Sequence, residues 1–471
     1  MKKILVGIFL LIAAISIFLI LIFQPFSNRE LAACDAGTNP PGRFMDFSLL
    51  LTDRDGSPLQ DKKITIRQVE QDFVLLIMED SELSGEFQQS LSFECEEYTK
   101  SSFRERAEYN KTQLEEMCHF EDMGITSRDN PRSVARISPS RLRDKSLSEQ
   151  GENQDRIEDE AMPKVTFEEY SEIDLDSTEM YLDLMVEHEV TPHMIQVCGE
   201  WNAWDLTSLK GLNLENLALH CDQIIRLTRE HYPDTLIAVD LLPFYYYPER
   251  GLCKPHCSYL DEHFFAGDHY ITDETFLDEL EKLDSPYDVI SVEYQMGHEH
   301  AGDAEDLIFL TERFKRYNKK LFNWDLTFLS QNSRYDCSPG VECSRWPEED
   351  REFTESWQAE QYQRYFEYVL NDPDNIGITM FFLKDPRPEP RPGSVVYAFS
   401  GFLREDGTEK PSLSTLFDFW DALQTNCYTQ TNQDGTLTFQ GNPGIYEIWI
   451  NGTFKKEEIY LTGSEPLTID F

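Results

Sequence analysis

The sequence predicts an α/β fold: a (β/α)8 TIM barrel with a small N-terminal β unit and a C-terminal β-sandwich module. From about residue 177 to 425, short apolar runs alternate with amphipathic helical stretches, and repeated strand–helix units favour a parallel sheet. Five or more such units occur in line, with long polar segments after the strands, and no GxGxxG motif follows any strand. A barrel is therefore favoured over a doubly wound, dinucleotide-binding sheet.

Strands and helices of the barrel can be assigned from their apolar patterns. The expected strands are residues 193–199, 235–242, 288–294, 321–326 and 376–383. A helical stripe that includes Leu217, Cys221 and Ile224 lies between the first two strands, and Asn213 can cap its start. Two further stripes, over 307–317 and 357–369, predict helices between later strands.

The flanking segments differ in composition. Residues 42–80 contain two strand-like runs, divided by a turn rich in Asp, Gly and Pro, and form the expected N-terminal β unit. Residues 90–425 would form the barrel domain, and within it residues 127–162, rich in Ser, Arg, Asp and Glu, would be a flexible insertion. After Thr425, short strands separated by Gly and Asn turns predict a β-sandwich module over 426–471.

The charge of the chain restricts its partners. The 471 residues include 87 acidic and 42 basic side chains, which gives a net charge of −45. Such a surface repels phosphate backbones, so we expect no nucleic-acid partner, and a neutral or cationic substrate fits better.

The N-terminus indicates export. Lys2 and Lys3 precede an uncharged apolar run, residues 4–23, which is long enough to span a bilayer. Residues 1–33 are either a cleaved signal peptide or an uncleaved membrane anchor, and both place the rest of the chain outside the cytoplasm. Leu31–Cys34 also resembles a bacterial lipobox, although charged residues separate it from the apolar run.

Ten cysteines suit an exported, disulfide-bonded protein. Cys253 with Cys257, and Cys337 with Cys343, are close enough in sequence to pair locally. A zinc site that includes His256 is the rival interpretation, but no second CxxC-like half follows. We expect neither a metal nor a cofactor.

Acidic residues occur where the predicted strands end. The four positions are Glu200, Asp240, Glu293 and Asp325. Reactive groups of barrel enzymes project from the carboxyl ends of the strands, so closure of the barrel would bring these acids into one cleft. Two carboxyl groups about 5–5.5 Å apart would give retaining glycoside hydrolysis, and a wider gap would give inversion.

Aromatic residues accompany these acids. Aromatic rings stack on the apolar faces of sugars, and amides bind their hydroxyl groups. The expected substrate-binding residues are Trp201, Asn202, Trp204, Tyr245, Tyr294 and Trp324. The combination is typical of a carbohydrate cleft.

Several segments resemble the retaining glycosidases of the (β/α)8 clan, most closely the family-10 xylanase type. Met194-Ile-Gln-Val-Cys-Gly-Glu-Trp-Asn-Ala-Trp204 resembles the strand-4 segment whose Glu is the acid/base, and this implies that role for Glu200. Lys319-Lys-Leu-Phe-Asn-Trp-Asp-Leu326 resembles the strand-7 segment that carries the nucleophile, and this implies Asp325. Gly377–Phe382 and Gly401–Pro411 resemble strand 8 and the ending of that barrel.

Two departures from the family pattern bear on activity. Gly199 stands where the family has Asn, and Asp325 stands where it has Glu. A side chain one methylene shorter withdraws its carboxylate, and a misplacement near 1 Å can cost about 10²-fold in rate. Glu293 and Asp240 are therefore kept as alternative catalytic residues.

Three functions follow as hypotheses. The first is an exported, xylanase-like hydrolase that cleaves β-linked polysaccharide by a two-carboxylate mechanism. The alternative is a catalytically degenerate, surface-anchored glycan-binding protein. A metal-dependent hydrolase that uses His256, His263, His298 and His300 is less favoured, because their spacing suits neither a helical nor a strand-borne zinc motif.

Overall fold

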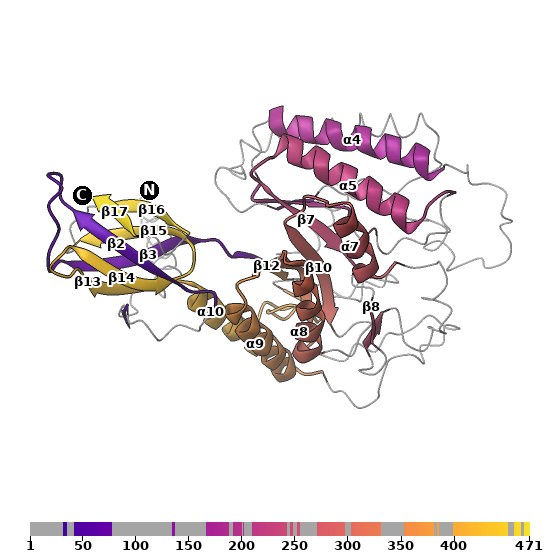
Figure 1. Ribbon diagram of the computed structural model, residues 1–471. Coiled ribbons are helices and arrows are strands. Elements are labelled where there is room, and N and C mark those ends of the chain that lie inside the picture. The colour runs from indigo at the N-terminus through magenta and orange to yellow at the C-terminus, as the bar shows by residue number, and fades with distance from the viewer. Residues whose placement is uncertain are drawn as a thin grey trace, which may run out of the picture. The chain divides into compact units, whose positions relative to one another are not determined.

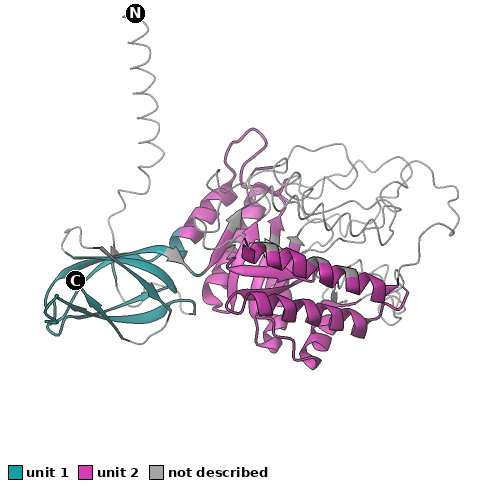
Figure 2. Ribbon diagram, turned by 90° about the horizontal axis from the view of Figure 1, so that it is seen from above, with its two compact units in different colours: residues 1–72, 421–471 teal, residues 73–420 magenta. Residues whose placement is uncertain are grey.

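The computed structural model describes residues 32–34, 42–77, 134–136, 166–187, 192–199, 201, 210–242, 245–247, 252–254, 271–296, 303–330, 353–380, 384–385, 399–450, 456–462 and 466–471. The chain divides into two compact units (Figure 2). One unit joins residues 1–72 to residues 421–471, and the other comprises residues 73–420.

The larger unit contains a seven-stranded parallel sheet (Figure 1). Its strands are β4 (Val74–Ile77), β5 (Val134–Arg136), β6 (Met194–Val197), β7 (Leu236–Leu241), β10 (Val289–Met296), β11 (Lys320–Phe328) and β12 (Asn375–Met380). Five of them confirm the five strands that the sequence predicts in this region.

The seven strands follow one another around the sheet as in a barrel that is open on one side. Neighbours across the sheet run β4-β12-β11-β10-β7-β6-β5, so the strand that comes first in the chain pairs with the last one. All other neighbours are consecutive in the chain among these strands. A barrel has this cyclic order, and here the cycle is open only between β4 and β5. The residues between those two strands, 78–133, lie outside the described part.

Helices alternate with the strands. They are α4 (Phe167–Glu187), α5 (Leu214–His231), α7 (Asp273–Lys282), α8 (Ala304–Glu312), the 3₁₀ segment η6 (Arg313–Tyr317), α9 (Glu355–Asn371) and α10 (Pro411–Leu423). The expected cap is confirmed: Asn213 accepts a hydrogen bond from the backbone N–H of Asn216 (2.8 Å). Thr272, Asp303 and Thr354 cap α7, α8 and α9 in the same way.

The predicted apolar stripes are buried. Leu217, Cys221 and Ile224 of α5 have no exposed surface, and the same is true of Leu307 and Leu310 of α8. One strip of each helix thus supplies the apolar surface that packs toward the sheet. A two-stranded antiparallel sheet, β8 (Tyr245–Tyr247) with β9 (Leu252–Lys254), follows β7.

The smaller unit consists of two sheets. Its five-stranded sheet has the order β1 (Ala32–Ala33), β13 (Asn426–Gln430), β3 (Lys63–Gln71), β15 (Gly444–Ile450), β16 (Lys456–Leu461). Its three-stranded sheet has the order β14 (Thr436–Gly441), β2 (Met45–Thr52), β17 (Leu467–Asp470). The rings of Phe47, Phe439 and Tyr446 meet in its core, with centroids 5.3–5.8 Å apart.

Domain organisation differs from the sequence-based expectation in three ways. Residues 42–80 and 426–471 were expected to form separate modules, yet their strands share both sheets of the smaller unit, for example where β3 pairs with β13. β4 pairs instead with β12 in the parallel sheet. Residues 134–136, within the expected flexible insertion 127–162, form strand β5 beside β6.

Two disulfides join described cysteines: Cys34 with Cys427, and Cys198 with Cys221. The first uses the Cys34 sulfur that a lipoprotein's thioether would need, so the lipobox interpretation does not fit. The local pairs expected at Cys253/Cys257 and Cys337/Cys343 lie outside the described side chains. None of the described helices is long and apolar enough to cross a bilayer, and the apolar run at 4–23 is not among the described residues.

Candidate active site at the carboxyl end of the parallel sheet

One face of the parallel sheet, here called the inner face, is apolar in its amino-terminal half. It carries Val74, Met194, Ala238, Val289 and Phe322, which are fully buried together. A Cβ atom on Gly377 would lie 2.5 Å from the Phe322 ring and 2.6 Å from the Val74 carbonyl oxygen, so only glycine fits beneath that ring. The inner face is thus tightly packed at this end.

The same face becomes polar toward the carboxyl ends of the strands. Alternate residues of a strand share a face, so Gln196 follows Met194 there, Asp240 follows Ala238, and Ser291 and Glu293 follow Val289. Gln196 donates from Nε2 to Ser291 Oγ (2.7 Å), and Ser291 donates to Asp240 Oδ1 (3.2 Å). An apolar floor beneath a polar layer is the arrangement of a barrel active site.

These polar groups are deeply buried. Gln196, Asp240 and Ser291 have no exposed surface, and Glu293 retains 4%. Burial of a carboxylate is costly unless hydrogen bonds replace its water, and Ser291 supplies one such bond to Asp240. Gln196 Oε1 and Thr379 Oγ1 are buried without a hydrogen-bond partner among the described groups. Each of these two oxygens can therefore still accept a hydrogen bond.

Asp325 lies at an irregularity of β11. Between Glu293 and Gln295, β10 advances two residues while β11 advances three, from Trp324 to Thr327. The pairing with β12 shifts over the same stretch, from Asn323 to Leu326. One extra residue therefore enters β11 beside Asp325. Bulges of this kind often occur next to active sites, where they redirect a side chain. The structure describes the backbone of Asp325 but not its side chain.

Glu200 follows β6 directly and lies outside the described residues, as do Asn202 and Trp204. Its neighbour Trp201 is described and differs from expectation. Trp201 is only 1% exposed, and its ring stacks on His220 of α5 with centroids 4.9 Å apart and planes 7° apart. The structure thus gives Trp201 a packing position in place of the expected sugar-binding one.

Two of the other predicted aromatic residues, Trp324 and Tyr294, lie on opposite faces of the parallel sheet. Trp324 pairs with Glu293 across β10 and β11, so it shares the inner face, where it is partly buried. Tyr294 is the next residue after Glu293 and so points to the opposite, helix-covered side. Burial raises its pKa, with Arg313 and Asp273 nearby. Tyr294 therefore packs against helices, away from the polar layer. Tyr245 lies in β8, and the structure describes its backbone but not its side chain.

Sequence reasoning missed Gln196 and Ser291. Both lie inside apolar strands, Gln196 four residues before Glu200 and Ser291 two residues before Glu293, and their polar character was the available signal. Gln196 can reach Ser291 across β7 because Ala238, the β7 residue opposite Gln196, has a small side chain. Asp240 and Glu293, kept as alternatives, are both part of the polar layer.

The described residues contain no group of three or more His, Cys, Asp or Glu side chains arranged to hold a metal ion. His256, His263, His298 and His300 lie outside the described residues.

No protein-family model and no curated protein matches the chain. Among solved structures, the native xylanase 10B from Thermotoga maritima is 14% identical over 55% of this chain and 68% of its own, with a TM-score of 0.36. The GH53 catalytic domain of Ignisphaera aggregans is 16% identical over 64% and 77%, with a TM-score of 0.40. An endo-1,4-beta-xylanase from Penicillium canescens is 12% identical over 61% and 73%, with a TM-score of 0.38. Because these similarities are low, the fold described here is taken from the strand order of the chain itself and not from the solved structures.

Proposed function

We propose that the chain is an exported glycoside hydrolase that cleaves β-linked polysaccharide with two carboxyl groups. The observation that supports it most is the polar inner layer, in which Asp240 and Glu293 lie on adjacent parallel strands, toward their carboxyl ends. The backbone of Asp325 belongs to the next strand, β11, beside its bulge. Glu200 follows the fourth, β6. A complete (β/α)8 barrel, which needs one more strand between β4 and β5, is part of this proposal.

The chemistry assigns a role to each carboxyl group. Glu200 protonates the glycosidic oxygen as its bond to the anomeric carbon breaks, and Asp325 attacks that carbon to form a glycosyl ester. Glu200, now a carboxylate, takes a proton from water, whose oxygen attacks the same carbon and releases Asp325. Glu293 is the alternative nucleophile, because it lies on the strand next to Asp325. Trp324, opposite Glu293, would stack on a sugar ring.

Export is the second part of the proposal. Two disulfides among the described residues fit an oxidising compartment, in which such bonds persist. The polysaccharide substrate would then be met outside the cytoplasm, whether the N-terminal segment is cleaved or retained as an anchor.

The test is release of reducing ends from a panel of neutral β-linked polysaccharides. Glu200→Gln should lower turnover by about 10²-fold or more, the range of a positioned general acid. Glu305→Gln is the matched control, because Glu305 on α8 has a side chain that is 65% exposed. Hydrolysis by Glu200→Gln at the wild-type rate would refute the assignment of the acid.

Azide rescue separates the two carboxyl roles. In a variant without the nucleophile, azide attacks the β-linked substrate directly and gives an α-glycosyl azide. In a variant without the acid/base, azide attacks the glycosyl ester and gives the β-glycosyl azide. We expect the α product from Asp325→Asn and the β product from Glu200→Gln. The α product from Glu293→Gln would transfer the nucleophilic role to Glu293.

A second candidate function is glycan binding without turnover. The placement of Trp201 and Tyr294 favours it, because both rings are buried in packing contacts and leave the expected cleft with fewer aromatic faces. It predicts retention of a neutral glycan by the wild type, no reducing ends, and loss of retention in Trp204→Ala. Sustained turnover that depends on Glu200 would exclude it.

A further inference from the structure

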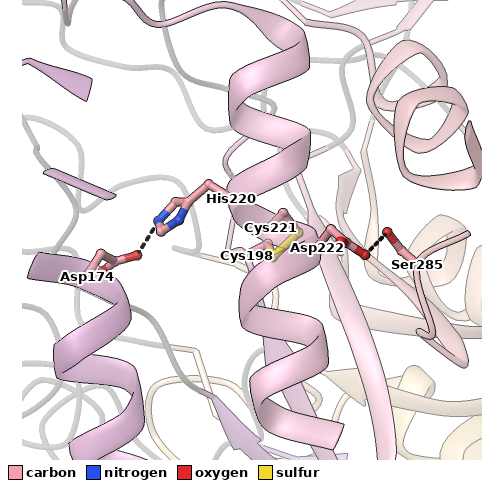
Figure 3. Close-up of a disulfide and its surroundings, with 6 residues drawn as sticks. All are labelled: Asp174, Cys198, His220, Cys221, Asp222 and Ser285. Atoms are coloured by element: carbon pink, nitrogen blue, oxygen red, sulfur yellow. Dashed lines mark hydrogen bonds and ion pairs between the residues drawn. A yellow bond between two sulfur atoms is a disulfide. The ribbon is translucent and has the colours of Figure 1, made fainter. Parts of the chain in front are cut away.

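The segment that follows β6 is fastened to α5 at two consecutive helix positions. Cys198 forms a disulfide with Cys221 (Figure 3), and Trp201 stacks on His220. The Trp201 N–H also donates to the Cys198 carbonyl oxygen (3.3 Å), which closes a tight turn. Cys198 adopts a left-handed backbone conformation, with φ at 58°, and its side chain reaches α5 from there. Both ends of residues 198–201 are thus attached to one helix.

His220 is itself held by α4. Its Nε2 lies 2.9 Å from Asp174 Oδ2, and its Nδ1 lies 2.8 Å from Ser171 Oγ. The rings of Phe167 and Tyr170 meet it edge-on, with centroids 5.8 and 6.1 Å away. Contacts on both ring nitrogens and on the ring face leave the imidazole one orientation.

A Ser–His–Asp set raises the question of nucleophilic catalysis, and the geometry answers it. The imidazole is 1% exposed, Asp174 is 3% exposed, and Trp201 covers one face of the ring. A substrate cannot reach the atoms between Ser171 and His220 in this arrangement, so the set supports packing.

Residue 200 lies between the two attachments, one residue after Gly199 and directly before Trp201. We propose that the Cys198–Cys221 disulfide and the Trp201–His220–Asp174 assembly are a positioning device, which holds the backbone on either side of the catalytic acid. This inference rests on the proposed function, because it takes residue 200 as the acid. Positional errors near 1 Å can reduce a rate by about 10²-fold, so a clamp on both sides has a catalytic consequence.

The experiment compares substrates that differ in their need for an acid. A β-linked polysaccharide has a poor leaving group and needs protonation, whereas a dinitrophenyl glycoside has a good leaving group and does not. We expect Trp201→Leu, and the double variant Cys198→Ser/Cys221→Ser, to lose about 10- to 100-fold in kcat/KM on the polysaccharide and less than about threefold in kcat/KM on the aryl glycoside. The ratio kcat/KM reports the first step, in which Glu200 acts as the acid, whereas kcat on the aryl glycoside also depends on Glu200 as the base of the second step. On the polysaccharide KM should change little, and Trp201→Phe should restore most of the rate.

The second disulfide of the chain provides the matched control. Cys34→Ser/Cys427→Ser removes one disulfide from the other compact unit and should leave kcat/KM on both substrates unchanged. Equal losses on both substrates, or no loss on the polysaccharide, would overturn the positioning role while Glu200-dependent turnover by the wild type upholds the proposed function. Absence of that turnover in the wild type would overturn both.

Discussion

Ser291 of β10 lies directly opposite Asp240 of β7 in the parallel sheet, and its hydroxyl donates to the buried carboxylate. The same oxygen accepts a hydrogen bond from Gln196 of β6, so one side chain links three strands. All three residues lack exposed surface. Removal of one partner of a buried hydrogen bond therefore lowers the free energy of unfolding more than at the surface, because no water molecule takes the partner's place.

Ser291→Ala should therefore lower the free energy of unfolding by about 1–3 kcal/mol, the cost of leaving buried polar groups unsatisfied. Denaturant titration of the purified chain measures the change. Ser57→Ala is the matched control: Ser57 lies in an exposed turn, and its loss should change stability by less than about 0.5 kcal/mol. Equal effects of the two substitutions would show that the network contributes nothing.

The buried pair of Asp273 and Arg313 predicts a pH dependence. Burial raises the pKa of Asp273 to about 7, since desolvation outweighs the attraction of Arg313. For a carboxyl group whose pKa is higher in the folded state, the stabilisation is complete below the unfolded value near 3.9 and is lost as the pH rises through about 7. Arg313→Met removes the cation that lowers the pKa of Asp273, so the pKa of this carboxyl group rises further.

We expect Arg313→Met to lose about 3–5 kcal/mol of stability at about pH 8, where the uncompensated carboxylate is buried, and less at about pH 5, where it is protonated. Thermal unfolding at the two pH values measures the difference. Arg316→Met is the control, because the Arg316 side chain is 48% exposed and its ion pairs are worth at most about 1 kcal/mol. A loss that does not vary with pH would contradict the role of Asp273.

Local patterns predicted the elements of the larger unit well. Apolar runs gave the five later strands of the parallel sheet, and a helical stripe with Asn213 before it gave α5 and its cap. These features depend on residues near one another in the chain. It was harder to predict on which face of the sheet each strand residue lies, because this depends on the neighbouring strands. Glu293, for example, lies on the inner face and Tyr294 on the opposite face.

Long-range pairing could not be predicted from the same patterns. β3 and β13 share a sheet although more than half of the chain separates them, and periodicity does not say which strands will pair. Trp201 next to an acid fitted a sugar-binding ring until its partner was known. That partner, His220, belongs to a helix whose amphipathic pattern gives no indication of a stacking contact.

Lys410 and Asp385 form a second buried ion pair. Lys410 Nζ donates to Asp385 Oδ1 (2.7 Å) and to Ser330 Oγ (2.9 Å), and Lys410 is 3% exposed. Burial lowers the pKa of Lys410 and raises that of Asp385, although each partner opposes the effect on the other. Lys410→Met should cost about 3–5 kcal/mol at neutral pH, because it leaves the carboxylate buried without its cation.

A second substitution tests that cause. Asp385→Asn in the Lys410→Met background removes the remaining charge, and the amide oxygen can still accept from the Gly401 N–H. The double variant should therefore unfold at a higher denaturant concentration than Lys410→Met alone. Lys320→Met, at a side chain that is 47% exposed, controls for loss of a lysine. A double variant less stable than Lys410→Met would mean that the Asp385 carboxylate stabilises the fold even without its lysine, so that its uncompensated charge is not the cause of the loss.

The Cys34–Cys427 disulfide ties β1 to β13 across 393 residues of sequence. A crosslink over so long a loop restricts the unfolded chain, and its loss typically costs about 2–5 kcal/mol. In Cys34→Ser/Cys427→Ser the amides of β13 and β3 should exchange with solvent faster, because these strands lie next to the bond in the five-stranded sheet. Amides of α5, in the other compact unit, serve as the internal reference and should keep their protection. Unchanged exchange in β13 would mean that its pairing with β3 and the packing of Phe47, Phe439 and Tyr446 protect this sheet without the disulfide.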